Sequence, residues 1–135
     1  MEYKNWDASF AGHASLGNYV YNNVASGNAY YSEMLYEGYL RNAPASVLET
    51  GFVNSQFFSD YYVENASFLR LDNVNVGYTF NDVFDVLNSL RISATVQNVF
   101  VITDYSGLDP EVFGGIDNNI YPRPRTFVLG LNLNF

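Results

Sequence analysis

The chain contains no cysteine, and only 15% of its 135 residues are charged. Without cysteine, a disulfide framework and cysteine-based zinc sites are excluded. There is no run of 18 apolar residues, so no transmembrane helix is predicted, and the opening MEYKNWDASF lacks the apolar segment of a signal peptide. The formal net charge of −8 argues against nucleic acid as a partner, because phosphates are neutralised by clustered Lys and Arg.

Aromatic residues and alternating apolar and polar residues are what the sequence has in excess. There are 12 Tyr and 11 Phe. Alternation is typical of strands with one apolar and one polar face. It predicts strands at about 5–16, 67–80, 90–103 and 125–135. The alternation changes phase near Asp72 and Asn73, which predicts a β-bulge in preference to two short strands.

Two long segments, about 19–65 and 104–124, separate these strands, whereas 81–89 is predicted as a short connection with one helical turn. Loops of this length are uncommon and usually functional. Within the first, SEMLYEGYL (32–40) predicts a short helix capped by Ser32. If the strands are antiparallel neighbours, both long segments fall at one end of the sheet, as in outer-membrane barrels.

The last predicted strand has the length of a membrane-spanning strand. Phe127 and Phe135 lie roughly 27 Å apart at about 3.4 Å per residue, which becomes roughly 21 Å along the membrane normal at a tilt of about 40°. The apolar band of a barrel is about 25 Å tall. Alternation alone also suits a soluble core, but the loop asymmetry and the final Phe favour the membrane. We therefore predict lipid contact for Phe127, Leu129, Leu131, Leu133 and Phe135.

Residues 67–135 resemble the C-terminal end of the SusC/RagA-type TonB-dependent outer-membrane transporters of Bacteroidota. Four motifs in this order carry the resemblance: FLRLDNV, the QN of 97–98, YSGLDPEV and YPRPRTF. The matching positions are expected to be structural. They are Arg70, Asp72, Gln97, Asn98, Asp109, Pro110, Pro122, Arg123, Pro124 and Arg125.

The resemblance implies an all-β fold: four long antiparallel strands in a meander, with two long extracellular loops, forming the C-terminal part of a 22-stranded transmembrane barrel. It also implies import of oligosaccharides, or of peptides, across the bacterial outer membrane, with a SusD-like lipoprotein and TonB as partners. The 135 residues include no TonB box, no plug domain and none of the other strands. We therefore expect the chain to be a fragment that does not transport alone, and not an enzyme.

The tyrosines of the first long segment are the candidate contacts for a ligand or partner, because Tyr combines a flat apolar face with a hydroxyl group. Packing within the segment, or an aromatic girdle, is the open alternative. The candidates are Tyr30, Tyr31, Tyr36, Tyr39, Tyr61 and Tyr62.

Two other functions are considered. The first is a soluble β-sandwich that binds glycans through its Tyr-rich loops. The second, weaker one is a glycoside hydrolase using Asp109 and Glu111, although Asp-Pro-Glu is also good turn chemistry. The lone His13 is interpreted as a polar, lumen-facing residue. No catalytic residue, cofactor or metal site is predicted.

The two arginines of YPRPRTF could bind an anion, but we expect them to order the neighbouring loop instead. Arg123 and Arg125 are predicted to pair with the acidic residues of the second long segment, which are Asp109, Glu111 and Asp117. Surface pairs of this kind contribute at most about 1 kcal/mol each.

Overall fold

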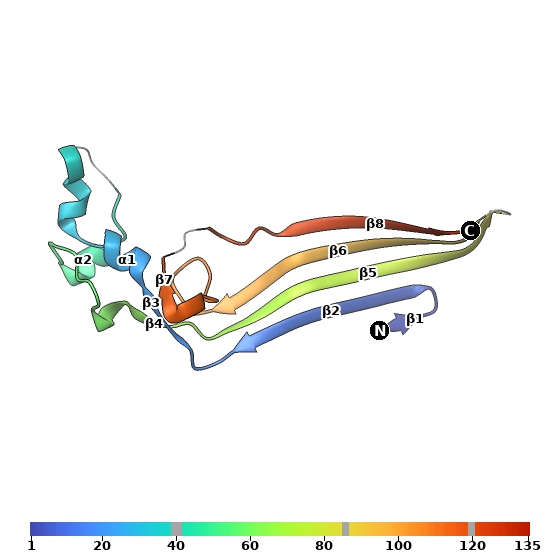
Figure 1. Cartoon of the computed structure of the whole chain (residues 1–135), viewed down its shortest axis with the longest axis horizontal. Helices are drawn as coiled ribbons and strands as arrows, with labels where there is room; N and C mark the ends of the chain where they lie inside the picture. The colour runs from blue at the N-terminus through green and yellow to red at the C-terminus, as the bar shows by residue number, and fades with distance from the viewer. Residues whose placement is uncertain (39–41, 85–86, 119–120) are drawn as a thin grey trace. The chain divides into compact units, whose positions relative to one another are not determined.

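A computed structural model describes residues 1–38, 42–84, 87–118 and 121–135 (Figure 1). The described chain divides into two compact units. Unit 1 comprises Met1–Ser15, Phe68–Ile102 and Arg123–Phe135, and unit 2 comprises Leu16–Ser67 and Thr103–Pro122. Unit 2 is therefore made from the two long segments between the predicted strands. Among the described residues, no helix is long and apolar enough to cross a membrane.

Unit 1 is a five-stranded sheet in the order β1-β2-β5-β6-β8, whose strands lie side by side in Figure 1. The pairs β1–β2, β2–β5 and β6–β8 are antiparallel, and β5 and β6 are hydrogen-bonded neighbours. The predicted all-β, antiparallel fold is confirmed. The strands are β1 (Glu2–Tyr3), β2 (Trp6–Ser15), β5 (Phe68–Phe84), β6 (Leu87–Thr103) and β8 (Thr126–Asn134).

The two central strands are longer than the sequence predicts. β5 and β6 have 17 residues each, so the prediction of a connection with a helical turn over 81–89 is wrong. Residues 81–84 continue β5 and residues 87–89 begin β6, while 85 and 86 lie outside the described residues. β5 and β6 are hydrogen-bonded neighbours, and strand pairing satisfies backbone N–H and C=O groups whether or not the local sequence alternates.

The predicted β-bulge is confirmed. Ala11 of β2 pairs with Asn73, and the next residue, Gly12, pairs with Leu71. Asp72 is thus the extra residue in β5. Because the bulge absorbs one residue, the apolar side chains of β5 before and after it face the same side of the sheet.

The sheet of unit 1 has one apolar and one polar face, since paired residues project to the same side. Between β6 and β8 the apolar pairs are Leu90–Leu133, Ile92–Leu131, Ala94–Leu129 and Val96–Phe127. The pairs between them include Ser89–Asn134, Arg91–Asn132 and Gln97–Thr126. The apolar face is open: Trp6 is 53% exposed, Phe10 72% and Leu129 84%. A soluble β-sandwich would cover such a face with a second sheet.

Unit 2 contains a second sheet, in the order β4-β3-β7, which the sequence does not predict. Its strands are β3 (Tyr19–Asn22), β4 (Val63–Asn65) and β7 (Ile116–Asp117). β3 pairs antiparallel with β4 and parallel with β7, so the sheet joins the two long segments. They are therefore folded around one another rather than irregular loops.

Short helices complete unit 2. They are α1 (Asn23–Asn28), η1 (Tyr31–Gly38), α2 (Ser46–Thr50), η2 (Asp60–Tyr62) and η3 (Phe113–Gly115). The helix predicted over 32–40 corresponds to η1, a 3-10 helix. Ser32 lies inside this helix and does not cap it, and positions 39 and 40 lie outside the described residues.

The buried apolar side chains of unit 2 form two clusters. One contains Val20, Ala66 and Tyr105, with Val112 packed against it. The other contains Ala29, Val47 and Tyr62, with Tyr21, Ala25, Ala43 and Phe52 packed around it. Residues from both long segments meet in the first cluster, so each segment stabilises the other.

The register of β2 against β5 predicts the effect of adding a side chain at the bulge. A Cβ on Gly12 would lie 2.5 Å from the carbonyl oxygen of Arg70, so Gly12→Val must push the two strands apart. We expect it to cost about 1–3 kcal/mol of stability, measured as the urea midpoint of unfolding in detergent micelles. Ala8→Val, on the same face of the same strand, is the control. Equal midpoints for the two variants would contradict this account.

Candidate functional site

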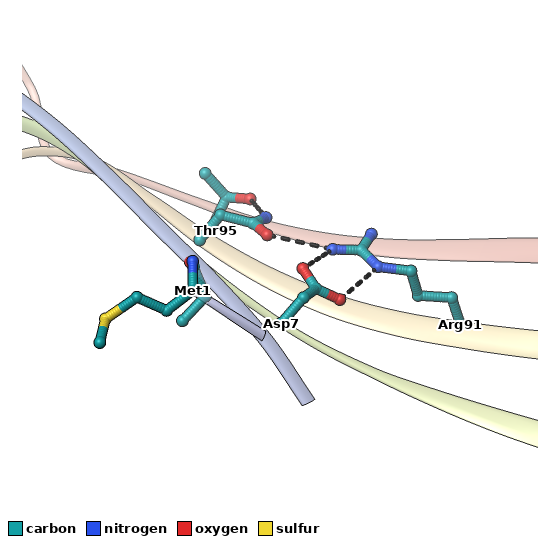
Figure 2. Close-up of polar contacts among 6 residues, drawn as sticks. Met1, Asp7, Arg91 and Thr95 are labelled. Carbon is teal, nitrogen blue, oxygen red and sulfur yellow. Dashed lines mark hydrogen bonds and ion pairs between the residues drawn. The ribbon is translucent and has the colours of Figure 1, made fainter. Parts of the chain in front are cut away.

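A network of polar side chains crosses the polar face of unit 1 (Figure 2). Arg91 of β6 forms a two-pronged ion pair with Asp7 of β2, in which Nε donates to Oδ2 at 2.8 Å and Nη2 donates to Oδ1. Arg91 Nη2 also donates to Asn75 Oδ1 of β5 at 3.2 Å. Asn75 in turn donates to the Thr95 hydroxyl. Side chains from three neighbouring strands are thereby tied together on this face.

This ion pair depends on a glycine. β5 lies between β2 and β6 in the sheet, and Gly77 of β5 is the direct partner of Asp7. A Cβ at Gly77 would overlap both the Arg91 guanidinium and the Asp7 carboxylate. Asp7, Gly77 and Arg91 are not among the site residues that the sequence predicts. One sequence feature could have indicated this ion pair. It is a glycine at a polar-face position of the middle strand, with an acidic residue on the strand to one side and a basic residue on the strand to the other.

Four of the motif residues meet toward the other end of β6. Arg70, which is only 3% exposed, donates from Nη1 to Asn98 Oδ1 at 3.0 Å. Asn98 Nδ2 donates to the Arg123 carbonyl at 2.6 Å, and Arg125 Nε donates to the Asn98 carbonyl at 3.5 Å. Asn98 has φ +52°, a region that Asn tolerates better than most residues. The motifs therefore join β5, β6 and the segment that leads into β8.

The bulge residue of the FLRLDNV motif also makes a cross-strand contact. Asp72 Oδ2 lies 2.8 Å from His13 Nδ1 of β2. The His13 ring packs edge-on against Phe68, with centroids 5.3 Å apart. His13 therefore has structural partners on the sheet. Among the described residues, no group of three or more side chains suitable for metal binding is found.

The remaining motif residues are placed as follows. Gln97 pairs with Thr126 of β8. Pro110 is fully buried. Asp109 Oδ1 accepts from the Glu111 backbone N–H at 2.9 Å, which is a turn contact. Pro122 and Pro124 lie before β8. The predicted pairing of Arg123 and Arg125 with the acidic segment stays a prediction.

A buried polar network lies between the two long segments of unit 2. The Tyr105 hydroxyl donates to Asp117 Oδ2 at 2.7 Å, and burial together with this carboxylate raises the pKa of Tyr105. Asn22 Nδ2 donates to Glu64 Oε1 at 3.0 Å and to Ser106 Oγ at 3.1 Å. Ser106 donates its N–H and its hydroxyl to Glu64, at 2.8 and 2.7 Å. Ser106 thus bonds the second long segment to Asn22 and Glu64 of the first, whereas the Tyr105–Asp117 bond lies within the second segment.

A groove of about 680 Å³ lies beside this network within unit 2. Its polar lining includes Asn22, Asn28, Asn42, Ser106 and Asp117, and its apolar lining includes Pro44 and Leu108. The volume is within the range of small-molecule sites. Amide and hydroxyl groups with one carboxylate suit a polar ligand that carries no negative charge.

The candidate tyrosines differ in exposure. Tyr62 is 3% exposed, whereas Tyr31 is 40% and Tyr61 is 48% exposed. Tyr61 packs edge-on against Tyr62, with centroids 5.1 Å apart, and burial raises the pKa of Tyr62. The Tyr30 hydroxyl donates to Glu33 at 2.8 Å. Tyr39 and the side chain of Tyr36 lie outside the described residues.

The comparisons with known proteins find relatives along the whole chain. It is 44% identical to the TonB-dependent receptor SusC of Bacteroides thetaiotaomicron and 29% identical to the TonB-dependent receptor P3 of Formosa agariphila. Both alignments cover 100% of this chain, but only 14% and 15% of the relatives. No family model matches the chain.

Solved structures lead to the same group of proteins. The structure of the RagAB peptide transporter matches with a TM-score of 0.74 at 27% identity, over 98% of this chain and 16% of that one. The RagAB peptide importer in its closed-closed state also matches with a TM-score of 0.74, at 25% identity. The present chain thus spans about one sixth of the length of these proteins or less.

The hydrogen bonds of Asn98 predict a graded response to substitution. Asn98→Gly keeps the backbone freedom that φ +52° requires but removes the side-chain bonds, which should cost about 1–3 kcal/mol. Asn98→Ala removes the side-chain bonds and also disfavours the positive φ, so it should cost about 1 kcal/mol more than Asn98→Gly. Urea unfolding of the two variants against the unaltered protein measures the order. Equal costs would show that only the side-chain bonds matter, and a larger cost for Asn98→Gly would contradict the role given to the positive φ.

The buried Tyr105–Asp117 bond predicts a second effect. Tyr105→Phe keeps the ring in the core and removes the donor to Asp117, so unit 2 should lose about 1–3 kcal/mol. Asp117→Asn retains an acceptor oxygen and should cost less. The rate of protease cleavage within 103–122 reports this opening. An unchanged rate in Tyr105→Phe would mean that the bond does not hold the second long segment closed.

Proposed function

Because this chain belongs to the SusC/RagA family of TonB-dependent receptors, we propose that it forms part of the wall of an outer-membrane nutrient transporter. It spans 14% of the length of the SusC relative. Transport is therefore proposed for the longer protein, to which this chain contributes strands and the folded excursions of unit 2. The observation that carries the proposal is the open apolar face of unit 1.

The dimensions of that face support contact with a bilayer. The apolar positions of β5 run from Leu69 to Phe80. With the bulge residue left out, this is roughly 34 Å at about 3.4 Å per residue, or roughly 26 Å along the membrane normal at a tilt of about 40°. Near one end, Trp6, Tyr78 and Phe80 pack edge to face with centroid distances of 4.8 and 4.6 Å. An aromatic girdle at a membrane interface has this composition.

The last strand supports the same orientation. Phe127, Leu129, Leu131, Leu133 and Phe135 are 73%, 84%, 73%, 52% and 75% exposed. We propose that these side chains face lipid and that the opposite face, with the Asp7–Arg91 pair, lines a watery lumen. Strands can cross a bilayer only when their backbone groups are bonded to neighbouring strands. In the longer protein, β1 and β8 would be bonded on their second sides as well.

We propose an oligosaccharide as the substrate and place unit 2 on the extracellular side. The amide and hydroxyl lining of the groove and the exposed aromatic rings of unit 2 support a sugar. A peptide, the cargo of the RagAB peptide transporter, is the second candidate. A SusD-like lipoprotein would cover the mouth, and TonB would supply energy through the N-terminal part of the longer protein.

The soluble β-sandwich is disfavoured by the same face. Large apolar side chains of β2 and β8 are more than half exposed, including Phe10 at 72% and Leu131 at 73%. Contiguous apolar surface of this kind marks a membrane or protein contact.

The proposed orientation, with unit 2 on the extracellular side, is tested by adding protease to intact cells that produce the full-length receptor. Cleavage within 53–58 is expected, and complete protection would overturn the proposed orientation.

Charge placed on the two faces of β8 tests membrane insertion directly. Leu131→Arg puts a cation on the apolar face and should destabilise the inserted receptor by about 2–4 kcal/mol. Asn132→Arg, the next residue, faces the other side and should cost much less. Urea unfolding from lipid vesicles, followed by heat-modifiable migration on gels, measures both. Equal tolerance of the two substitutions would contradict lipid contact at β8.

A further inference from the structure

Phe58 is the most unusual aromatic residue in unit 2. Its φ is +59°, a left-handed conformation that is a genuine outlier for a bulky residue. Its side chain is nevertheless 86% exposed, so no burial of the ring compensates for the strain. Strain of this kind persists only where the surroundings hold it, and it concentrates at functional sites.

Tyr21 holds Phe58 in this conformation. The Phe58 backbone N–H donates to the Tyr21 hydroxyl at 2.8 Å. The two rings are stacked, with centroids 6.0 Å apart and planes at 22°. Tyr21 therefore supports one face of the Phe58 ring, and the 86% exposure leaves the other face to solvent.

The supporting residue is itself fixed to the core. Tyr21 lies in β3, where it pairs with Val63 of β4 and Ile116 of β7. Its ring also packs edge-on against the buried Tyr62, with centroids 6.4 Å apart. The exposed ring is thus preorganised, and a ligand that stacks on it would lose little additional freedom of the protein.

The charge of unit 2 limits what this ring can bind. By sequence, ranges 16–67 and 103–122 contain nine acidic residues and one basic residue, whereas unit 1 contains five of each. The net charge of −8 therefore belongs entirely to unit 2. Its field repels anionic ligands such as uronic-acid or sulfated oligosaccharides.

We propose that Phe58, supported by Tyr21, is a stacking platform for a ring of an uncharged oligosaccharide. The apolar C–H face of a sugar ring covers one aromatic face, which is the surface that Phe58 offers. Exposed Asp60, two residues along the chain, supplies a hydrogen-bond acceptor for sugar hydroxyls. A protein partner would instead need to enclose the ring in a pocket. The proposal rests on the transporter function above and names the chemistry of its substrate.

Binding to the full-length receptor in detergent micelles tests the platform by isothermal titration. The probes are maltoheptaose, cellohexaose, mannohexaose and inulin oligosaccharides, with hexagalacturonate as the anionic probe. Phe58→Gly removes the ring and suits the positive φ. We expect at least one uncharged probe to bind and Phe58→Gly to weaken it at least tenfold. Phe57→Ala, at the adjacent 63% exposed aromatic, should change affinity less than twofold.

Tyr21→Phe provides a second variant, which keeps the stacked ring and removes the hydroxyl that accepts from Phe58. An intermediate loss of affinity is expected. The proposal is overturned if no uncharged probe binds, if hexagalacturonate binds as well as the best of them, or if Phe58→Gly binds normally. Loss of a co-purifying protein by Phe58→Gly with unchanged sugar affinity would also overturn it. Membrane insertion, measured by heat-modifiable migration, separates these outcomes from failure of the proposed transporter function.

Discussion

The backbone hydrogen bonds between neighbouring strands are the constraint on which unit 1 depends. Where one face of a sheet meets hydrocarbon, each unpaired N–H or C=O costs several kcal/mol. If the apolar face of unit 1 meets lipid, as proposed, both the strand pairing and the apolar face have to continue past the bulge in β5. With Asp72 as the extra residue, the apolar residues on either side of the bulge keep a common face, and the Asp72 carboxylate adds a side-chain contact to His13 across the two strands.

The distribution of charge follows from the same division. Unit 1 has as many basic as acidic residues, and its Asp7–Arg91 pair is bonded at two points. That pair reaches across β5 only because Gly77 has no side chain. The sheet thus lacks side-chain packing at this position and has a bonded charge pair there instead. Unit 2 carries the excess of carboxylates. Two of them, Glu64 and Asp117, accept hydrogen bonds within its fold, and under the proposed function the excess would disfavour anionic ligands.

Period-two alternation is local information, and this is why the long strands and the bulge at Asp72 could be predicted from the sequence. β7 has two residues and β4 has three. These strands are too short to show any periodicity, so the sheet of unit 2 could not be predicted from the sequence. Asp7 and Arg91 are 84 positions apart, and their meeting depends on the register of three strands. The tyrosines were singled out by type. Their exposure depends on tertiary packing, so the sequence alone does not show that Tyr62 is buried and Phe58 is exposed.

The QN and YPRPRTF motifs have one physical explanation together. Pro122 and Pro124 have no N–H, so the segment before β8 cannot bond to β6 as a regular ladder. Asn98 substitutes for the ladder: its Nδ2 donates to the carbonyls of Arg123 at 2.6 Å and Pro124 at 3.5 Å. Asn98 makes this contact while its backbone has a positive φ and its Oδ1 accepts a hydrogen bond from buried Arg70. In this chain the proline-rich approach to β8 is held by a polar side chain at the matching position of β6, so the two motifs act as one contact.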